Sequence, residues 1–193
     1  DIAKKIDTAV FPVFQGGPHM HQIAAKAVAF HEALHPSFAK YAKQIIANTH
    51  AMEKIFKNHN TRMITGGSDN HLILLDAWTS FGISGGEAEA LLDRSSITLN
   101  KNVIADDTRK PMDPSGIRFG TPAMTTRGFG EAESAKVAQI MIDVLTKRAT
   151  KFPYERSELG NLKYSCGDDA TVAKAKQEVK KLAHAHPILE SFA

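Results

Sequence analysis

The sequence predicts an α/β fold of the α+β type, in which a small, mostly antiparallel sheet is covered by helices and follows a helical segment. Two observations lead to this prediction. Apolar residues recur at helical spacing over residues 20–34 and 37–58. Beyond residue 60, short apolar or alternating runs bounded by Gly, Asp or Ser are typical of strands.

Composition limits the possible functions. The chain has 193 residues, 42% of them hydrophobic, which fits one globular domain or one domain with a piece of another. The formal net charge of +3 includes no basic block, so we expect neither a nucleic acid nor a membrane as partner. A single cysteine, Cys166, excludes a disulfide framework and indicates a reducing, cytoplasmic location.

The first part of the chain is predicted to be helical. A basic amphipathic start runs into Val10–Phe14 and stops at the turn Gln15-Gly16-Gly17-Pro18. An Ala-rich helix follows over residues 20–34, and Pro36 is expected to end it. A long helix over residues 37–58 separates a segment with helical patterns from one in which strand and helix patterns alternate. We therefore place the domain boundary at its start, giving domains 1–36 and 37–193.

The second part alternates strand and helix patterns. Ser84 and Glu87 have the spacing of a capping box, which predicts a short helix after them. Strands, loops and later helices are expected, in chain order, at 62–65 (strand), 72–75 (strand), 97–99 (strand), 100–115 (polar loop), 116–120 (strand), 137–145 (helix), 150–168 (loop) and 172–183 (helix).

One metal motif stands out. His31-Glu32-Ala33-Leu34-His35 matches H-E-x-x-H, in which two histidines on one helical face bind zinc and the glutamate acts as general base. Pro36 directly after it argues against a supporting turn. The alternatives are a zinc-dependent hydrolase and a solvated helix face, and we favour the second.

Two further features suit small anions. Gly16 and Gly17 precede a helix, where free backbone N–H groups can approach a phosphate, although most Gly-Gly turns bind nothing. Arg118 lies on a predicted strand between Gly116 and Gly120, pointing to the face opposite Ile117. A guanidinium there can bind both oxygens of a carboxylate, or pair with a nearby aspartate: Asp106, Asp107 or Asp113.

Taken in order, several segments resemble serine hydroxymethyltransferase, a family of fold-type-I pyridoxal phosphate (PLP) enzymes. The resemblance covers about residues 3–150 and outweighs the zinc motif, because the family has Lys where His31 stands. The matching segments are Ala9–Pro12, Gln15–Pro18, Ile23–Phe30, Gly66–Leu72, Ile97–Asn102, Ser115–Arg118, Gly120–Ala123 and Arg127–Phe129.

The resemblance implies that this chain is the C-terminal part of a longer enzyme. The chain begins at Asp1, without Met, inside a predicted helix. In the family, the lysine that binds PLP lies in a Thr-Thr-His-Lys-Thr segment that this sequence does not contain. We therefore expect residues 1–36 to belong to the PLP-binding large domain of an aspartate-aminotransferase-like fold, and the chain alone to be inactive.

The resemblance also assigns roles to individual residues. Arg118 corresponds to the arginine that holds the substrate carboxylate, and Gly16 and Gly17 to the turn that reaches the PLP phosphate of the neighbouring subunit of a homodimer. The residues implied to lie near folate are Phe11, Asn102, Lys110, Pro111 and Met112; the family's usual Ser-Pro-Phe is here Lys110-Pro111-Met112. The family reaction interconverts serine and tetrahydrofolate with glycine and 5,10-methylenetetrahydrofolate.

Overall fold

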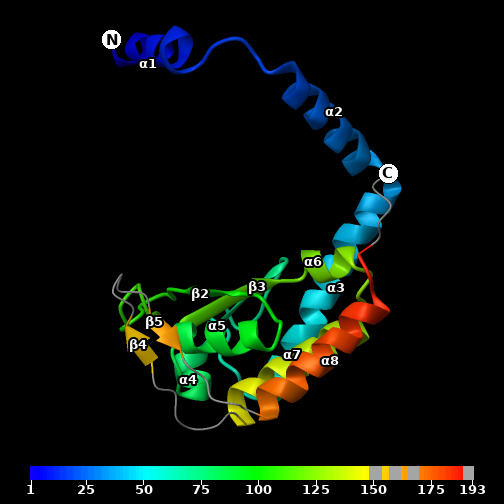
Figure 1. The fold of residues 1–193 in the computed structure, drawn as a ribbon. Helices are drawn as coiled ribbons and strands as arrows, with labels where there is room; N and C mark the ends of the chain where they lie inside the picture. The colour runs from blue at the N-terminus through cyan, green and yellow to red at the C-terminus, as the bar shows by residue number, and fades with distance from the viewer. Residues whose placement is uncertain (148–153, 157–161, 165–169, 189–193) are drawn as a thin grey trace. The chain divides into compact units, whose positions relative to one another are not determined.

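The computed structural model describes residues 1–147, 154–156, 162–164 and 170–188 (Figure 1). The chain divides into two compact units, Asp1–Lys40 and Tyr41–Ala193, and each is described by itself. Among the described residues, no helix is both long enough and apolar enough to cross a membrane. The predicted boundary between the domains of the complete fold, at residues 36 and 37, stays a prediction.

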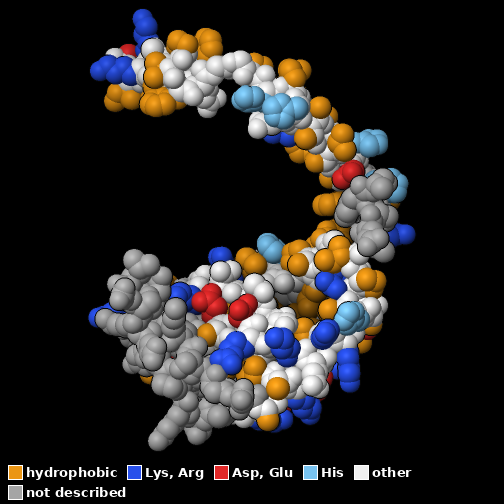
Figure 2. Space-filling model, viewed as in Figure 1, with side chains coloured by type: hydrophobic (Ala, Val, Ile, Leu, Met, Phe, Trp, Pro, Cys, Tyr) orange, Lys and Arg blue, Asp and Glu red, His pale blue; other side chains and the backbone are white. Residues whose placement is uncertain are grey.

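The first unit is helical, as predicted. It comprises α1 (Ile2–Thr8), the π-helical segment η1 (Ala9–Phe14), α2 (Met20–Leu34) and the first residues of α3. Inside η1, Phe11 and Pro12 depart from helical dihedral angles. No side chain of this unit is buried, and hydrophobic side chains are exposed along it (Figure 2).

The break between the two long helices falls where the sequence predicted it. His35 is extended, with φ −71° and ψ 141°, because the residue before a proline avoids the helical region. Pro36 does not only end α2, since it is also the first residue of α3 (Pro36–Asn58). Proline suits that position because the first helical N–H has no partner within its helix.

The second unit contains a three-stranded antiparallel sheet. Its strands are β1 (Leu72–Asp76), β2 (Asn100–Asn102) and β3 (Gly116–Gly120), in the order β1-β3-β2. β3 is therefore central, with Leu74 and Asn100 opposite Arg118 on its two sides. The second sheet pairs β4 (Tyr154–Arg156) with β5 (Leu162–Tyr164).

Helices cover one face of the main sheet and form the core with it. α4 (Ala77–Phe81) and α5 (Gly85–Arg94) contact the sheet, α7 (Glu131–Lys147) and α8 (Ala170–Ala185) contact α5, and α6 (Pro122–Thr126) lies beside α3. The predicted capping box opens α5: Ser84 Oγ accepts from Glu87 N at 3.1 Å, and Ser84 N donates to Glu87 Oε2 at 2.7 Å. The core is built from fully buried Phe56, Leu75, Leu91, Leu92, Ile117 and Leu145.

Three local predictions were wrong. Residues 62–65 form only an isolated bridge, between Met63 and Leu75, because the chain turns away at Gly66, whose φ is 72°. Residues 97–99 are not a strand: Ile97 N donates to Leu92 O at 2.8 Å and so belongs to the end of α5, and β2 begins at Asn100. The predicted loop 150–168 contains β4 and β5, whereas Cys166 lies outside the described residues.

Candidate active site

Arg118 occupies the middle of the central strand. Ile117 is fully buried, and Phe119 packs against the core on the same face, so Arg118 points to the opposite, exposed face as the alternation predicted. Gly116 and Gly120 on either side carry no side chain that could crowd the guanidinium. Among the described residues, the Arg118 side chain forms no ion pair or hydrogen bond, so the five N–H donors of its guanidinium are free.

The aspartates that could have paired with Arg118 are engaged elsewhere or unpaired. Asp113 forms an ion pair with Arg109, with 2.5 Å between Nη2 and Oδ2. Asp107 accepts hydrogen bonds from backbone and hydroxyl groups of its own loop. Asp106 has no ion pair in the described part of the chain. In the described residues Arg118 therefore pairs with none of these aspartates, and its binding of an external carboxylate stays a prediction.

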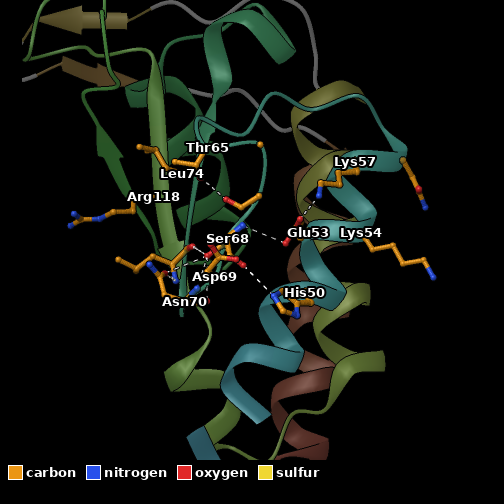
Figure 3. A pocket seen from close by; sticks show the side chains of 14 residues that line it. His50, Glu53, Lys54, Lys57, Thr65, Ser68, Asp69, Asn70, Leu74 and Arg118 are labelled. Carbon is orange, nitrogen blue, oxygen red and sulfur yellow. Dashed lines mark hydrogen bonds and ion pairs between the residues drawn. The ribbon is translucent and has the colours of Figure 1, made fainter. Parts of the chain in front are cut away.

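A cavity of about 850 Å³ borders Arg118 (Figure 3). It lies between α3 and the sheet, and its floor includes Leu72 and Leu74 of β1. In Figure 3, Arg118 extends from β3 on the side of the cavity away from α3. The lining from α3 and the following loop was not predicted as part of a site; it comprises His50, Glu53, Lys54, Lys57, Asn58, Thr65, Gly66, Gly67, Ser68, Asp69 and Asn70.

The loop 65–70 is tied to α3 through Ser68. Ser68 N donates to Glu53 Oε2 at 3.4 Å, and His50 Nε2 lies 3.2 Å from Ser68 O (Figure 3). Ser68 Oγ donates to Leu72 O at 2.5 Å, which joins the loop to β1. Glu53 also pairs with Lys57, so its charge is balanced within the wall of the cavity. Only the Gly-Gly-Ser-Asp-Asn turn signalled this wall in the sequence.

The residues predicted near folate lie in two different units. In the second unit, Asn102 ends β2, and its side-chain amide donates to Val103 O at 2.6 Å. Lys110, Pro111 and Met112 are exposed in the loop between β2 and β3. In the first unit, the Phe11 side chain is 65% exposed.

Gly16 and Gly17 precede α2 as predicted. Their backbone N–H groups donate no hydrogen bond within the described residues, and a Cβ built on either would meet nothing within 4 Å. His19, the N-cap of α2, forms no side-chain cap, so the first N–H groups of the helix are also open. These donors fit a phosphate.

The zinc motif lacks the geometry it needs. α2 ends at Leu34 and His35 is extended, so the two histidines do not share one face of a helix as the motif requires. The His35 Nδ1 lies 2.7 Å from Ser37 Oγ and accepts from Ser37 N at 3.2 Å. In the described part of the chain, no three His, Cys, Asp or Glu side chains gather as metal ligands. The zinc-hydrolase hypothesis has no support from this arrangement.

Comparisons with known proteins give one consistent family. The model of the family described as serine hydroxymethyltransferase matches residues 1–141. A serine hydroxymethyltransferase of Francisella philomiragia is 47% identical over 188 residues, which are 97% of this chain and 40% of that protein. Those of Francisella tularensis subsp. tularensis and subsp. novicida are 46% and 45% identical, with the same coverage.

The chain thus spans about 40% of the length of the curated relatives it matches. The family model extends through the Gly16–Gly17 turn, both walls of the cavity and Arg118. Since it matches 141 of the 193 residues, this chain belongs to the serine hydroxymethyltransferase family.

Proposed function

We propose that this chain is the C-terminal portion of a serine hydroxymethyltransferase, which interconverts serine and tetrahydrofolate with glycine and 5,10-methylenetetrahydrofolate. The observation that carries the proposal is Arg118: an arginine without an ion pair among the described residues, on the exposed face of β3 and at the edge of a large cavity. By its resemblance to the family, Arg118 would correspond to the carboxylate-binding arginine.

In this proposal, Arg118 binds the carboxylate of serine or glycine. Its planar guanidinium donates two parallel hydrogen bonds, one to each carboxylate oxygen, which fixes the rotation of the amino acid as well as its position. Fixing that rotation orients the bonds at Cα, and such positioning contributes much of an enzyme's rate enhancement. Because β3 is the central strand, its pairing with β1 and β2 fixes the backbone from which the Arg118 side chain extends.

The proposed cofactor is PLP, which when bound withdraws electrons from the amino acid. Gly16 and Gly17 would hold its phosphate through their free N–H groups, in the subunit next to the one that supplies Arg118 in a cytoplasmic homodimer. The PLP lysine would come from a Thr-Thr-His-Lys-Thr segment that these 193 residues do not contain. We therefore propose that the chain alone is inactive.

The proposed co-substrate, tetrahydrofolate, would contact Phe11, Asn102 and the segment Lys110–Met112. The exposure of Phe11 and Met112, 65% and 66%, leaves both side chains available for such a contact. Lys110 adds a positive charge where the family usually has Ser, and this charge would favour an anionic ligand.

The test is the serine-to-glycine reaction of the complete enzyme that carries this chain. We expect tetrahydrofolate-dependent formation of glycine, and an Arg118→Lys variant that loses most of its kcat/KM for serine, because lysine cannot supply the two-pronged contact. Arg94→Lys, at the exposed last turn of α5, is the matched control and should keep its activity. Near-native kcat/KM for serine in Arg118→Lys would refute the role of Arg118.

A further inference from the structure

The loop 103–115, between β2 and β3, is exposed in its middle and anchored at its ends. Near its start Ile104 is 8% exposed, and its side chain lies over Gly116, the first residue of β3. At its end Ser115 is 3% exposed. Lys110, Pro111 and Met112 lie between these anchors and contribute no buried side chain of their own. Something other than their own packing must therefore fix their conformation.

The carboxylate of Asp107 joins the two ends of this loop. Its Oδ2 accepts from Ile104 N at 3.3 Å and from Ser115 N at 3.0 Å. Its Oδ1 accepts from Arg109 N at 3.0 Å and from Ser115 Oγ at 2.7 Å. One side chain thus closes the loop at its base, through four hydrogen bonds to residues before and after the exposed segment.

Arg109 and Asp113 close a second, smaller ring around the exposed segment. Arg109 Nη2 pairs with Asp113 Oδ2 at 2.5 Å, and its Nε donates to Asp113 O at 3.1 Å. Asp113 N donates to Lys110 O at 2.9 Å. The Arg109 guanidinium also lies 4.2 Å from the centre of the Trp78 side-chain ring. This contact attaches the loop segment 109–113 to α4.

We propose that Asp107 is a positioning residue for tetrahydrofolate binding: its carboxylate holds the loop so that Lys110–Met112 is presented in one conformation. This inference rests on the function proposed above. Among the described residues, the Asp107 carboxylate forms hydrogen bonds only within its own loop, so in this proposal it acts on the loop and not directly on the ligand. Asp107 holds the backbone of Arg109 through the Arg109 N–H, and the Arg109 side chain in turn pairs with Asp113 on the other side of the exposed segment.

The charge state of Asp107 agrees with this role. Desolvation of the carboxylate opposes ionisation, but the hydrogen bonds from Ser115, Arg109 and Ile104 outweigh it and lower the pKa to about 2. At neutral pH both oxygens therefore only accept. An asparagine of the same shape would direct an NH₂ group at N–H donors and leave them unpaired.

Loss of this anchor would reduce affinity by reducing the fraction of loops in the binding conformation. The apparent dissociation constant is the intrinsic one divided by that fraction, so a competent fraction of about one tenth weakens binding about tenfold. The effect is specific to the ligand of the loop, because Arg118 is held by the pairing of β3 with β1 and β2.

The experiment measures steady-state kinetics of the complete enzyme with Asp107→Asn. We expect the KM for tetrahydrofolate to rise about tenfold, while the KM for serine and kcat at saturating folate stay within about twofold. The matched control is Asp106→Asn, which removes the same charge from the neighbouring exposed residue, and its three constants should not change. An unchanged tetrahydrofolate KM in folded Asp107→Asn would overturn the proposal. Equal damage to both KM values and kcat would also overturn it.

A second variant decides the matter if Asp107→Asn does not fold. Arg109→Gln keeps the backbone contact to Asp107 and removes the ion pair with Asp113 and the contact with Trp78, so the tetrahydrofolate KM should rise in the same selective way. No selective rise in that variant overturns the proposal. If the unmodified complete enzyme transfers no one-carbon unit from serine to tetrahydrofolate, the proposed function is wrong, and this inference is wrong with it. If the unmodified enzyme is active and the Asp107→Asn variant is unaffected, only this inference is refuted.

Discussion

Thr49 of α3 and Thr121, at the end of β3, share a hydrogen bond of 2.9 Å between their hydroxyl oxygens, although 72 residues separate them in the chain. Both residues are fully buried. Both hydroxyls also lie within hydrogen-bond distance of Ile45 O, at 3.0 and 2.9 Å. The two hydroxyl protons of Thr49 and Thr121 are therefore shared among three oxygen–oxygen contacts. These contacts fix Thr121, which directly follows the strand that carries Arg118.

Asn48 extends this buried polar contact between α3 and α6. Its Nδ2 donates to Thr125 Oγ1 and to Phe129 O, both at 2.9 Å. Asn48→Ala would leave the Phe129 carbonyl unpaired and open a cavity, so we expect it to lower the free energy of unfolding by about 2–4 kcal/mol. Urea unfolding followed by circular dichroism measures this change. Lys43→Ala, on the exposed side of the same helix, should stay within about 0.5 kcal/mol, and equal unfolding midpoints for both variants would contradict the prediction.

Asp76 should be a second determinant of stability. It is 1% exposed and caps α4: Oδ1 accepts from Thr79 N at 2.9 Å, and Oδ2 accepts from Thr79 Oγ1 at 2.6 Å and pairs with Arg62 at 2.5 Å. We expect Asp76→Ala to cost about 1–2 kcal/mol, because it removes the cap of α4 and the partner of Arg62. The same urea titration applies. Asp93→Ala, at an exposed position of α5, is the control, and a loss as small as that control's would disprove the role of Asp76.

The parts of the fold that the sequence predicts are those dictated by local chemistry. The apolar spacing over residues 20–34 predicts α2, and the alternation of Ile117 and Phe119 with Arg118 predicts β3. The errors have tertiary or single-residue causes. Ser96 adopts φ 64° and returns Ile97 to the end of α5, which moves the next strand to Asn100, and no periodicity reports such a conformation. The short α4 is too brief for any period to appear.

The candidate site divides in the same way. Arg118 is predictable, because an arginine alternating with apolar residues on a strand must point away from the core. The opposite wall of the cavity cannot be predicted from the sequence, because it forms only where α3 contacts the loop that follows it in the chain. The hydrogen bond from Ser68 N to Glu53 is one such contact. The alternative partners Asp107 and Asp113 could be dismissed only once their own contacts were visible.

The loop around Asp107 should open in acid. The pKa of Asp107 falls from 3.8 to about 2 on folding, so its contribution to stability is complete above pH 3.8 and is lost as the pH falls towards 2. Trp78 is the only tryptophan of the chain and lies against Arg109 of this loop, so its fluorescence and its quenching by iodide report the opening. We expect quenching of the 193-residue chain to increase as the pH falls from about 4 to about 2.

The control for this titration is Asp107→Asn. Its loop is already released at neutral pH, so Trp78 should be more accessible from the start and should show no transition of its own between pH 4 and 2. Far-UV circular dichroism recorded alongside separates loop opening from unfolding of the whole chain. Identical quenching curves for the unmodified chain and the variant would show that Asp107 does not hold the loop.

A close backbone approach between α5 and β3 gives the last prediction. Gly85 N donates to Pro114 O at 2.7 Å, and a Cβ added to Gly85 would collide with the Gly116 carbonyl and lie 3.0 Å from Pro114 O. Neither carbonyl can move without displacing the start of β3. We therefore expect Gly85→Ala to lower the free energy of unfolding by about 1–3 kcal/mol, as measured by urea unfolding.

Gly67→Ala is the matched comparison, because its Cβ would collide with the carboxylate of Glu53, the end of a flexible side chain that can turn aside. It should cost under about 1 kcal/mol by the same physics. A Gly85→Ala variant no less stable than Gly67→Ala would mean that the helix and the strand can separate freely at this point.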